Sequence, residues 1–255
     1  MSTQNEHSAE FSYLLRLADN ALLLGQQLGA LVGHGPELEE EMATANFALD
    51  YIGQARLLYS LASEFDTQKR DEDQLAYLRD SLDFQNLLLT EQPNGNFAQT
   101  LARQYYFESF YLEQLNALSQ SSNQQLAEIA VKAEKEIHYH LRHARQWLIR
   151  LGDGTELSTK RMQSALDELW QYTGEMFSAD EIDINVAKSG FGIDPGSLKE
   201  PWLEQVKADL TSARLTLPDG DWMASGGKQG RHSEYHGYIL AEMQFLQRSY
   251  PNSNW

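Results

Sequence analysis

The stretch KEIHYHLRH, residues 135–143, combines one glutamate with three histidines. Carboxylates and imidazoles at helical spacing are the ligands of di-iron four-helix bundles, in which two helices each supply a Glu-x-x-His pair and the other two a carboxylate. Here Glu136 and His140 are four residues apart, and the residue three before His140 is Ile137, which has no ligand atom. The stretch resembles half of a di-iron site but lacks the ligand that would complete it.

Two polar residues interrupt otherwise apolar helical stripes. Glu108 follows Tyr105 in the stripe of one predicted helix, and His140 follows Ile137 in the stripe of another. A buried carboxylate needs a cation, a metal or a proton. The pattern leaves two alternatives, a metal site with further ligands still to be identified or a paired core acid and base without metal.

A pair on another predicted helix has the spacing of metal ligands but not their chemistry. Tyr51 and Gln54 are three residues apart, but tyrosine binds iron only as a phenolate and an amide is a poor, neutral ligand. The first helix has no acid on its apolar stripe, because Asp19 lies beside it. Only Glu108 and His140 are plausible ligands, so we predict no metal ion and no catalytic residue in this chain.

The other histidines give weaker signals. His138 and His143 lie off the apolar stripe, and we expect solvent to surround them. His232 and His236 are one helical turn apart, a spacing that zinc sites can use with a third ligand. Ser233 stands where an HExxH motif has its acid, so zinc is the less favoured interpretation.

Helices must position these residues, because the apolar spacing is helical almost throughout. The spacing predicts helices over about 11–32, 37–65, 74–89, 97–118, 123–151, 160–177, from about 197, and over 232–250. Residues 1–152 are predicted to form a core four-helix bundle, and residues 153–255 to add helices and loops that pack on it. The second helix has two apolar seams, one of which includes Leu38, Met42 and Leu49, so it should pack between neighbours.

Two regions favour loops over helices. Residues 178–196 are rich in glycine and acidic residues, and residues 217–230 end in the glycine-rich GGKQG. That ending suggests a phosphate-binding loop, but neither a preceding strand nor a GK[ST] sequence is present. A flexible loop is the simpler interpretation.

Composition excludes several classes of function. The chain has no cysteine, which excludes zinc–thiolate sites, iron–sulfur clusters and thiol catalysis. With 20 Lys and Arg against 37 Asp and Glu its formal net charge is −17, so nucleic acid and membrane surfaces are not expected partners. The charge favours solubility first and a basic protein partner second. Neither a signal peptide nor a membrane-spanning apolar run is recognisable, which predicts a cytoplasmic protein.

Four stretches carry a resemblance to a known family: ANFALDYIGQARLLY (45–59), DFQNLLLTEQPNGNFAQTLARQYYF (83–107), KAEKEIHYHLRHARQWLIRLGDGT (132–155) and LAEMQFLQR (240–248). They resemble the structural C subunits of the bacterial phenylacetyl-CoA 1,2-epoxidases, the multicomponent oxygenases of phenylacetate degradation. The resemblance extends over nearly the whole chain, and NLLLTEQPNGNFAQT is its most specific part.

This resemblance implies a single ferritin-like domain over residues 1–255 and a non-catalytic, structural role in a hetero-oligomer. The chain would bind and stabilise a related di-iron catalytic subunit, on which the aromatic ring of phenylacetyl-CoA is oxidised. A reductase with a flavin and an iron–sulfur cluster would supply electrons, and a small further subunit is another expected partner. No cofactor is expected in this chain itself.

The resemblance also places the metal-ligand positions of the catalytic subunit on residues of this chain, most of which cannot bind metal. These positions are Tyr51, Gln54, Glu108, Ile137, His140 and, on the first helix, Ala21 or Leu22. KEIHYHLRH is then the remnant of a half-site, and we expect Glu108 to hydrogen-bond to Tyr51, Gln54 or His140. The alternatives are a stand-alone ferritin-like metal-dependent oxidase with an unusual ligand set, and a bundle whose degenerate pocket binds a small molecule.

Overall fold

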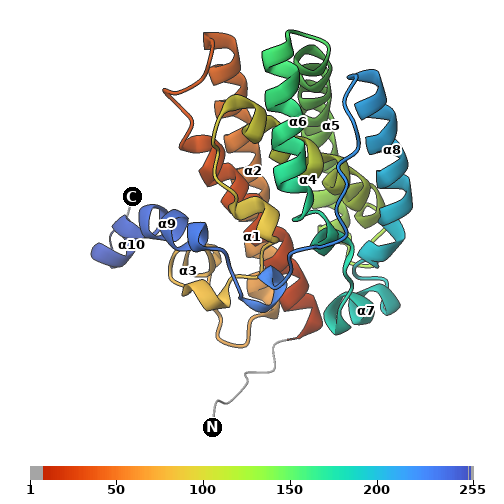
Figure 1. Cartoon of the computed structure of the whole chain (residues 1–255). Coiled ribbons are helices and arrows are strands. Elements are labelled where there is room, and N and C mark those ends of the chain that lie inside the picture. The colour runs from red at the N-terminus through yellow and green to blue at the C-terminus, as the bar shows by residue number, and fades with distance from the viewer. Residues whose placement is uncertain (1–7, 252, 254–255) are drawn as a thin grey trace.

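The computed structural model describes residues 8–251 and residue 253, and over these residues the chain contains helices and loops but no strand. The four longest helices form the bundle in Figure 1: α1 (Ala9–Gly29), α2 (Leu38–Phe65), α4 (Phe97–Leu118) and α5 (Gln124–Gly152). Helix α1 packs along α2, α4 packs along α5, and α2 meets α5. The predicted all-α long-helix bundle is confirmed.

The bundle helices begin where polar side chains cap them. Asn96 accepts hydrogen bonds from the backbone N–H groups of Ala98 and Gln99, while the Gln99 side chain accepts one from the Asn96 N–H. Asn123 likewise accepts from the N–H of Leu126 at 2.9 Å. These caps satisfy N–H groups that the helix itself leaves unpaired, so the helix starts at a defined residue.

Further helices follow the bundle, and all of them except α7 overlap predicted helices. They are α6 (Glu156–Trp170), α7 (Glu181–Lys188), α8 (Lys199–Ser212), α9 (Glu234–Met243) and α10 (Phe245–Ser249). Both α6 and α8 pack on α4 and α5, and the indole N–H of Trp202 in α8 donates to Ser109 at 2.8 Å. Helix α7 packs on α1, and α9 and α10 extend from the side of the bundle (Figure 1). None of the described helices combines the length and apolar character that a bilayer crossing requires.

The helix predicted over 74–89 is wrong. A short helix, α3 (Glu72–Tyr77), is followed by an irregular segment with 3-10 turns at Ser81–Asp83 and Leu88–Glu91. Side chains of α1 bind the backbone of this segment. Asp19 accepts from the N–H of Gln85, and Asn20 accepts from the N–H of Leu87, both at 2.8 Å. These bonds to α1 replace the bonds of a helix.

The turn in the family-like stretch EQPNGN is held by a buried arginine of α4. Arg103 donates to the Gln92 carbonyl at 2.5 Å and to the Asn94 side chain at 2.6 Å. Gln27 of α1 donates to the carbonyls of Glu91 and Gln92. The turn is therefore fixed between α1 and α4, which accounts for the burial of the polar residues Glu91 and Gln92 at its start.

Two predictions for the C-terminal part need correction. Residues 178–196 contain helix α7, which Asp180 caps by accepting from the N–H groups of Ile182 and Asp183. Two of the acidic residues that suggested a loop, Asp180 and Asp183, form this cap. The closing helix predicted over 232–250 is two helices that meet at Gln244, whose side chain donates to the carbonyl of Arg79 at 3.0 Å.

The first apolar seam of α2 was predicted to pack against a neighbour, and within this chain only part of it does. Tyr59 is buried against α1, and Ala45 and Ile52 are half-buried. Leu38, Met42 and Leu49 are 71%, 59% and 67% exposed. The second seam, which contains Tyr51 and Gln54, is buried as predicted. Helix α2 therefore has one face in the core, and the N-terminal half of its other seam, with Leu38, Met42 and Leu49, is exposed in the described part of the chain.

Candidate functional site

The five residues predicted to be degenerate ligand positions come together in the bundle core. Tyr51, Gln54, Glu108, Ile137 and His140 lie on α2, α4 and α5, and each is at most 2% exposed. The Tyr51 hydroxyl donates to Glu108 Oε1 at 3.1 Å, so the predicted contact between Glu108 and this group is confirmed. Ala21 and Leu22, the first-helix positions, are core residues.

The hydrogen-bond partners of Glu108 are neutral groups. Its Oε1 accepts from Tyr51 and, at 3.0 Å, from the side chain of Gln104, one turn earlier on α4. Its Oε2 has no hydrogen-bond partner among the described residues. Burial raises the pKa of Glu108 to about 8, although the hydrogen bonds from Tyr51 and Gln104 and the charge of the buried Arg103 act in the other direction. At neutral pH this carboxyl is therefore mainly protonated and uncharged.

His140 does not supply a counter-charge to Glu108. Its Nδ1 lies 3.9 Å from Glu108 Oε1 and has no hydrogen-bond partner among the described groups, while its Nε2 contacts Asp50 Oδ2 at 3.0 Å. Burial lowers the pKa of His140 despite the nearby Asp50 carboxylate, so the ring is neutral at pH 7. Of the three groups that could satisfy Glu108, the structure uses the Tyr51 hydroxyl and neither a protonated His140 nor Gln54.

The remaining polar side chains pair with residues outside the pocket. The Gln54 amide donates to Glu136 at 2.8 Å, so the acid of KEIHYHLRH faces α2 and not Glu108. His143, which we expected to be solvated, is half-buried and its Nε2 lies 2.8 Å from Glu40 Oε2. That expectation is wrong because α2 supplies an acid opposite α5. His138 is exposed, as expected.

The donor set does not fit a di-iron centre. Burial and the nearby Glu108 raise the pKa of Tyr51 well above its ordinary value, so its hydroxyl stays a phenol and not the phenolate that iron requires. Ile137 offers no ligand atom, and the Gln54 amide is neutral. The carboxyl of Glu108 is mainly protonated. Only His140 Nδ1 remains as a ready ligand, far fewer than a two-metal site needs.

The space beside these residues is small. A cavity of about 20 Å³ lies between Phe47, Glu108, His140 and the neighbouring residues. Such a volume holds about one water molecule. The pocket in this form is too small for an organic ligand, which argues against the alternative of a small-molecule binding bundle.

The whole chain, residues 1–255, matches the family described as "Phenylacetic acid catabolic protein". This chain belongs to that family. It is 48% identical over 244 residues to the C subunit of the 1,2-phenylacetyl-CoA epoxidase of Escherichia coli (strain K12), a match that covers 96% of this chain and 98% of that relative. The resemblance inferred from the sequence is confirmed, and the helical bundle is the ferritin-like fold of the family.

Outside the degenerate site, the described residues bring a second histidine cluster together. Ligand atoms of Glu91, His232 and His236 lie within 4.8 Å of one another. His232 contacts Glu91 Oε1 at 2.6 Å and the Phe84 carbonyl at 3.0 Å through its two ring nitrogens. The two rings are stacked, with centroids 3.8 Å apart and planes at 10°. Imidazole lone pairs lie in the ring plane, so stacked rings cannot both point at one ion, and this geometry favours a hydrogen-bonded cluster over zinc.

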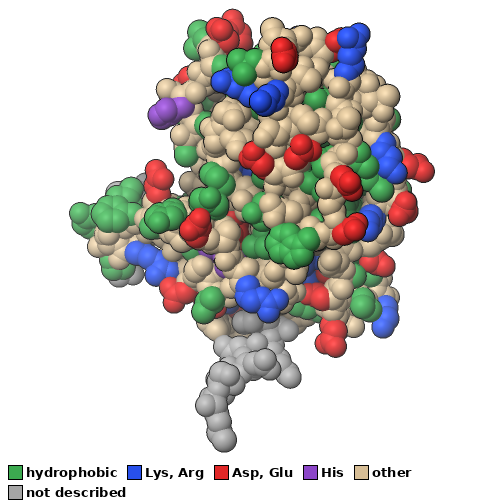
Figure 2. Space-filling view, in the orientation of Figure 1, with side chains coloured by type: hydrophobic (Ala, Val, Ile, Leu, Met, Phe, Trp, Pro, Cys, Tyr) green, Lys and Arg blue, Asp and Glu red, His purple; other side chains and the backbone are tan. Residues whose placement is uncertain are grey.

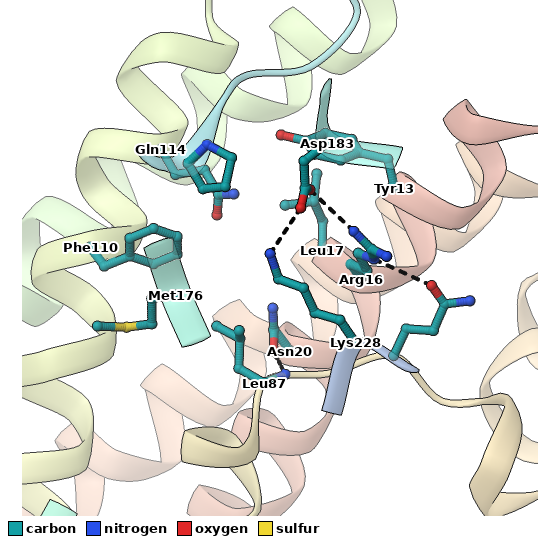
Figure 3. A pocket seen from close by; sticks show the side chains of 12 residues that line it. Tyr13, Arg16, Leu17, Asn20, Leu87, Phe110, Gln114, Met176, Asp183 and Lys228 are labelled. Atoms are coloured by element: carbon teal, nitrogen blue, oxygen red, sulfur yellow. Dashed lines mark hydrogen bonds and ion pairs between the residues drawn. The ribbon is translucent and has the colours of Figure 1, made fainter. Parts of the chain in front are cut away.

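The glycine-rich loop does bind an anionic group, but that group belongs to the chain. The N–H groups of Gly226 and Gly227 donate to Glu175 Oε1 at 2.7 and 2.8 Å. Lys228, the residue that would face a phosphate, contacts Asp183 at 3.0 Å, and Arg16 contacts the same carboxylate at 3.2 Å (Figure 3). The loop is therefore engaged with core acids, and the expectation of a flexible loop is not supported.

Sequence reasoning missed several polar partners in the core. Gln104 could have been found, because a residue one turn before Glu108 on the same helix shares its face. Asp50 could not, because it is 90 residues from His140 in the chain. Asp19, which we placed beside the stripe of α1, is fully buried and forms an ion pair with Arg79.

Proposed function

We propose that this chain is a non-catalytic structural subunit of a phenylacetyl-CoA epoxidase, and that it binds and stabilises the di-iron catalytic subunit. The observation that carries the proposal is the donor set around Glu108. A phenol, a neutral amide, an isoleucine and a protonated carboxyl stand at the ligand positions, so the bundle has the frame of a di-iron protein without its chemistry.

In this proposed role the chain itself carries out no step of the oxygenase chemistry. Oxygen activation and ring oxidation belong to the iron centre of the catalytic subunit, and a flavin and iron–sulfur reductase supplies the electrons. This chain contributes a rigid helical body, because its core polar groups are largely paired with one another. The exposed apolar seam of α2, with Leu38, Met42 and Leu49, supports a role in assembly, since monomers rarely leave such a face uncovered.

We predict that the purified chain carries no stoichiometric iron. Elemental analysis after expression in iron-rich medium measures this directly, with the catalytic subunit from the same medium as the positive control. The reason is that only His140 Nδ1 is a free, unprotonated ligand in the pocket. About two irons per chain would instead favour the alternative, a stand-alone oxidase with an unusual ligand set.

Reconstitution tests the structural role. Turnover of phenylacetyl-CoA should require the catalytic subunit, the reductase and this chain together, and this chain alone should show none. Without this chain we expect the catalytic subunit to lose solubility as well as activity, because the surface of the catalytic subunit that this chain covers would be exposed to solvent. Unchanged turnover and solubility of the catalytic subunit in the absence of this chain would overturn the proposal.

A further inference from the structure

The C-terminal arm, residues 231–251, is covered by the rest of the described chain along only a narrow edge. Helix α9 buries one narrow edge, made of His236, Leu240 and Met243, and α10 buries no residue. The arm projects from the side of the bundle (Figure 1). Helices this short are only marginally stable by themselves, so we infer that their uncovered side has a function.

The uncovered side of the arm is apolar and partly aromatic. Tyr238, Phe245 and Leu246 are 76%, 62% and 48% exposed, and Figure 2 shows hydrophobic side chains gathered over the projecting part. Open hollows lie along α9, one of about 360 Å³ beside Phe245 and Gly237 and one of about 290 Å³ beside Ile239. Exposed aromatic residues next to hollows are typical of protein interfaces.

The base of the arm is held firmly against the irregular segment after α3. His236 Nδ1 contacts Ser81 Oγ at 2.8 Å, and Arg248 donates to the Arg79 carbonyl at 2.7 Å. Gln244 donates to the same carbonyl. The exposed side chains are thus presented in a fixed position, which lowers the entropy that a partner must overcome on binding.

The arm differs from the rest of the molecule in its net charge. Residues 231–255 contain two arginines and two glutamates, so residues 1–230, with 18 Lys and Arg against 35 Asp and Glu, carry the whole net charge of −17. Because the arm carries no net charge, a partner that buries its apolar side chains is not opposed by an excess of like charge. A second copy of this chain and an anionic bilayer are both repelled by the acidic body, whereas a different protein with basic residues around an apolar groove is attracted.

We propose that the C-terminal arm is the element that docks into the di-iron catalytic subunit, in an apolar groove with a basic rim. This inference rests on the proposed function, which supplies the partner. The exposed seam of α2 is the competing surface, but it begins among the acids Glu37, Glu39 and Glu41. Burying this seam would therefore remove more negative charge from water than burying the arm, at a larger cost in free energy. Tyr238 and Phe245 are the expected anchors, because aromatic side chains dominate interface energetics.

The test compares binding of purified catalytic subunit to three variants of the full chain. The double variant Tyr238→Glu and Phe245→Glu should raise the Kd at least about 30-fold, as expected when interface hot spots are lost. Leu157→Glu is the matched control, because Leu157 is a 57% exposed residue of α6 far from the arm in sequence, and should leave the Kd within about 3-fold. Leu49→Glu probes the competing seam of α2.

Hydrogen exchange on the unmodified complex gives a readout that does not depend on how the variants fold. Backbone amides of 234–249 should exchange more slowly when the catalytic subunit is bound. Unchanged exchange there, together with arm variants that bind like the control, would overturn the inference, and a loss confined to Leu49→Glu would assign docking to α2. If the wild-type chain does not bind the catalytic subunit at all, the proposed function fails together with the inference.

Discussion

Replacing Arg79 with methionine should lower the free energy of unfolding by about 3–5 kcal/mol, the cost typical of removing one partner of a buried ion pair. Arg79 and Asp19 are 3% and 0% exposed. Asp19 accepts two hydrogen bonds from Arg79, one of them at 3.2 Å, and another from the Tyr59 hydroxyl at 2.5 Å. Burial by itself would lower the pKa of Arg79, but the Asp19 carboxylate holds this pKa above its ordinary value. The variant strands that carboxylate in the core.

Urea denaturation measures the effect, and two further variants identify its cause. Arg56→Met breaks an ion pair with Glu72 whose arginine side chain is 76% exposed, so it should cost at most about 1 kcal/mol. Adding Asp19→Leu to Arg79→Met should recover part of the loss, because it removes the stranded charge. A loss for Arg79→Met as small as that for Arg56→Met would contradict the assignment of this pair as a buried determinant of stability.

The parts of the fold that could be predicted from the sequence are those governed by local rules. Helix α4 has the predicted ends, Phe97 and Leu118, because Asn96 caps it and apolar residues recur along one face. The contact between Glu108 and Tyr51 could be predicted as well, because both lie in apolar seams of helices that pack in one bundle. Periodicity identifies which side chains face inward, and so it located this cluster of core residues.

The parts that could not be predicted depend on contacts between distant segments. The segment after α3 has apolar spacing that suggests a helix, but Asp19 and Asn20 of α1 bind its backbone in another conformation. The partner of Asp19 is 60 residues away, and no spacing rule pairs the two residues. Periodicity also predicts that a face is to be buried without saying by what, which is why the first seam of α2 was expected inside this chain.

Replacing Glu108 with glutamine should make the chain more stable at pH 8 and leave its stability near pH 5 almost unchanged. Burial raises the pKa of Glu108 from the ordinary 4.5 to about 8. A carboxyl whose pKa is higher in the folded than in the unfolded state contributes its full stabilisation at pH values below the unfolded-state pKa. This contribution is lost as the pH rises through the folded-state pKa. Each pKa unit corresponds to about 1.4 kcal/mol, so Glu108 should reduce the free energy of unfolding by about 4 kcal/mol between pH 4.5 and 8.

The glutamine is a close mimic of the protonated acid. Its carbonyl oxygen can accept from Tyr51 and Gln104 as Glu108 Oε1 does, and its amide replaces an Oε2 that has no hydrogen-bond partner among the described groups. Denaturation of wild type, Glu108→Gln and the exposed control Glu113→Gln on the same helix, at several values between pH 5 and pH 9, separates the effect from general charge repulsion. The wild type and Glu113→Gln should lose stability as the pH rises, whereas the curve for Glu108→Gln should be flatter. Parallel curves for all three would show that Glu108 is ionised in the folded chain at neutral pH and that a cation compensates for it.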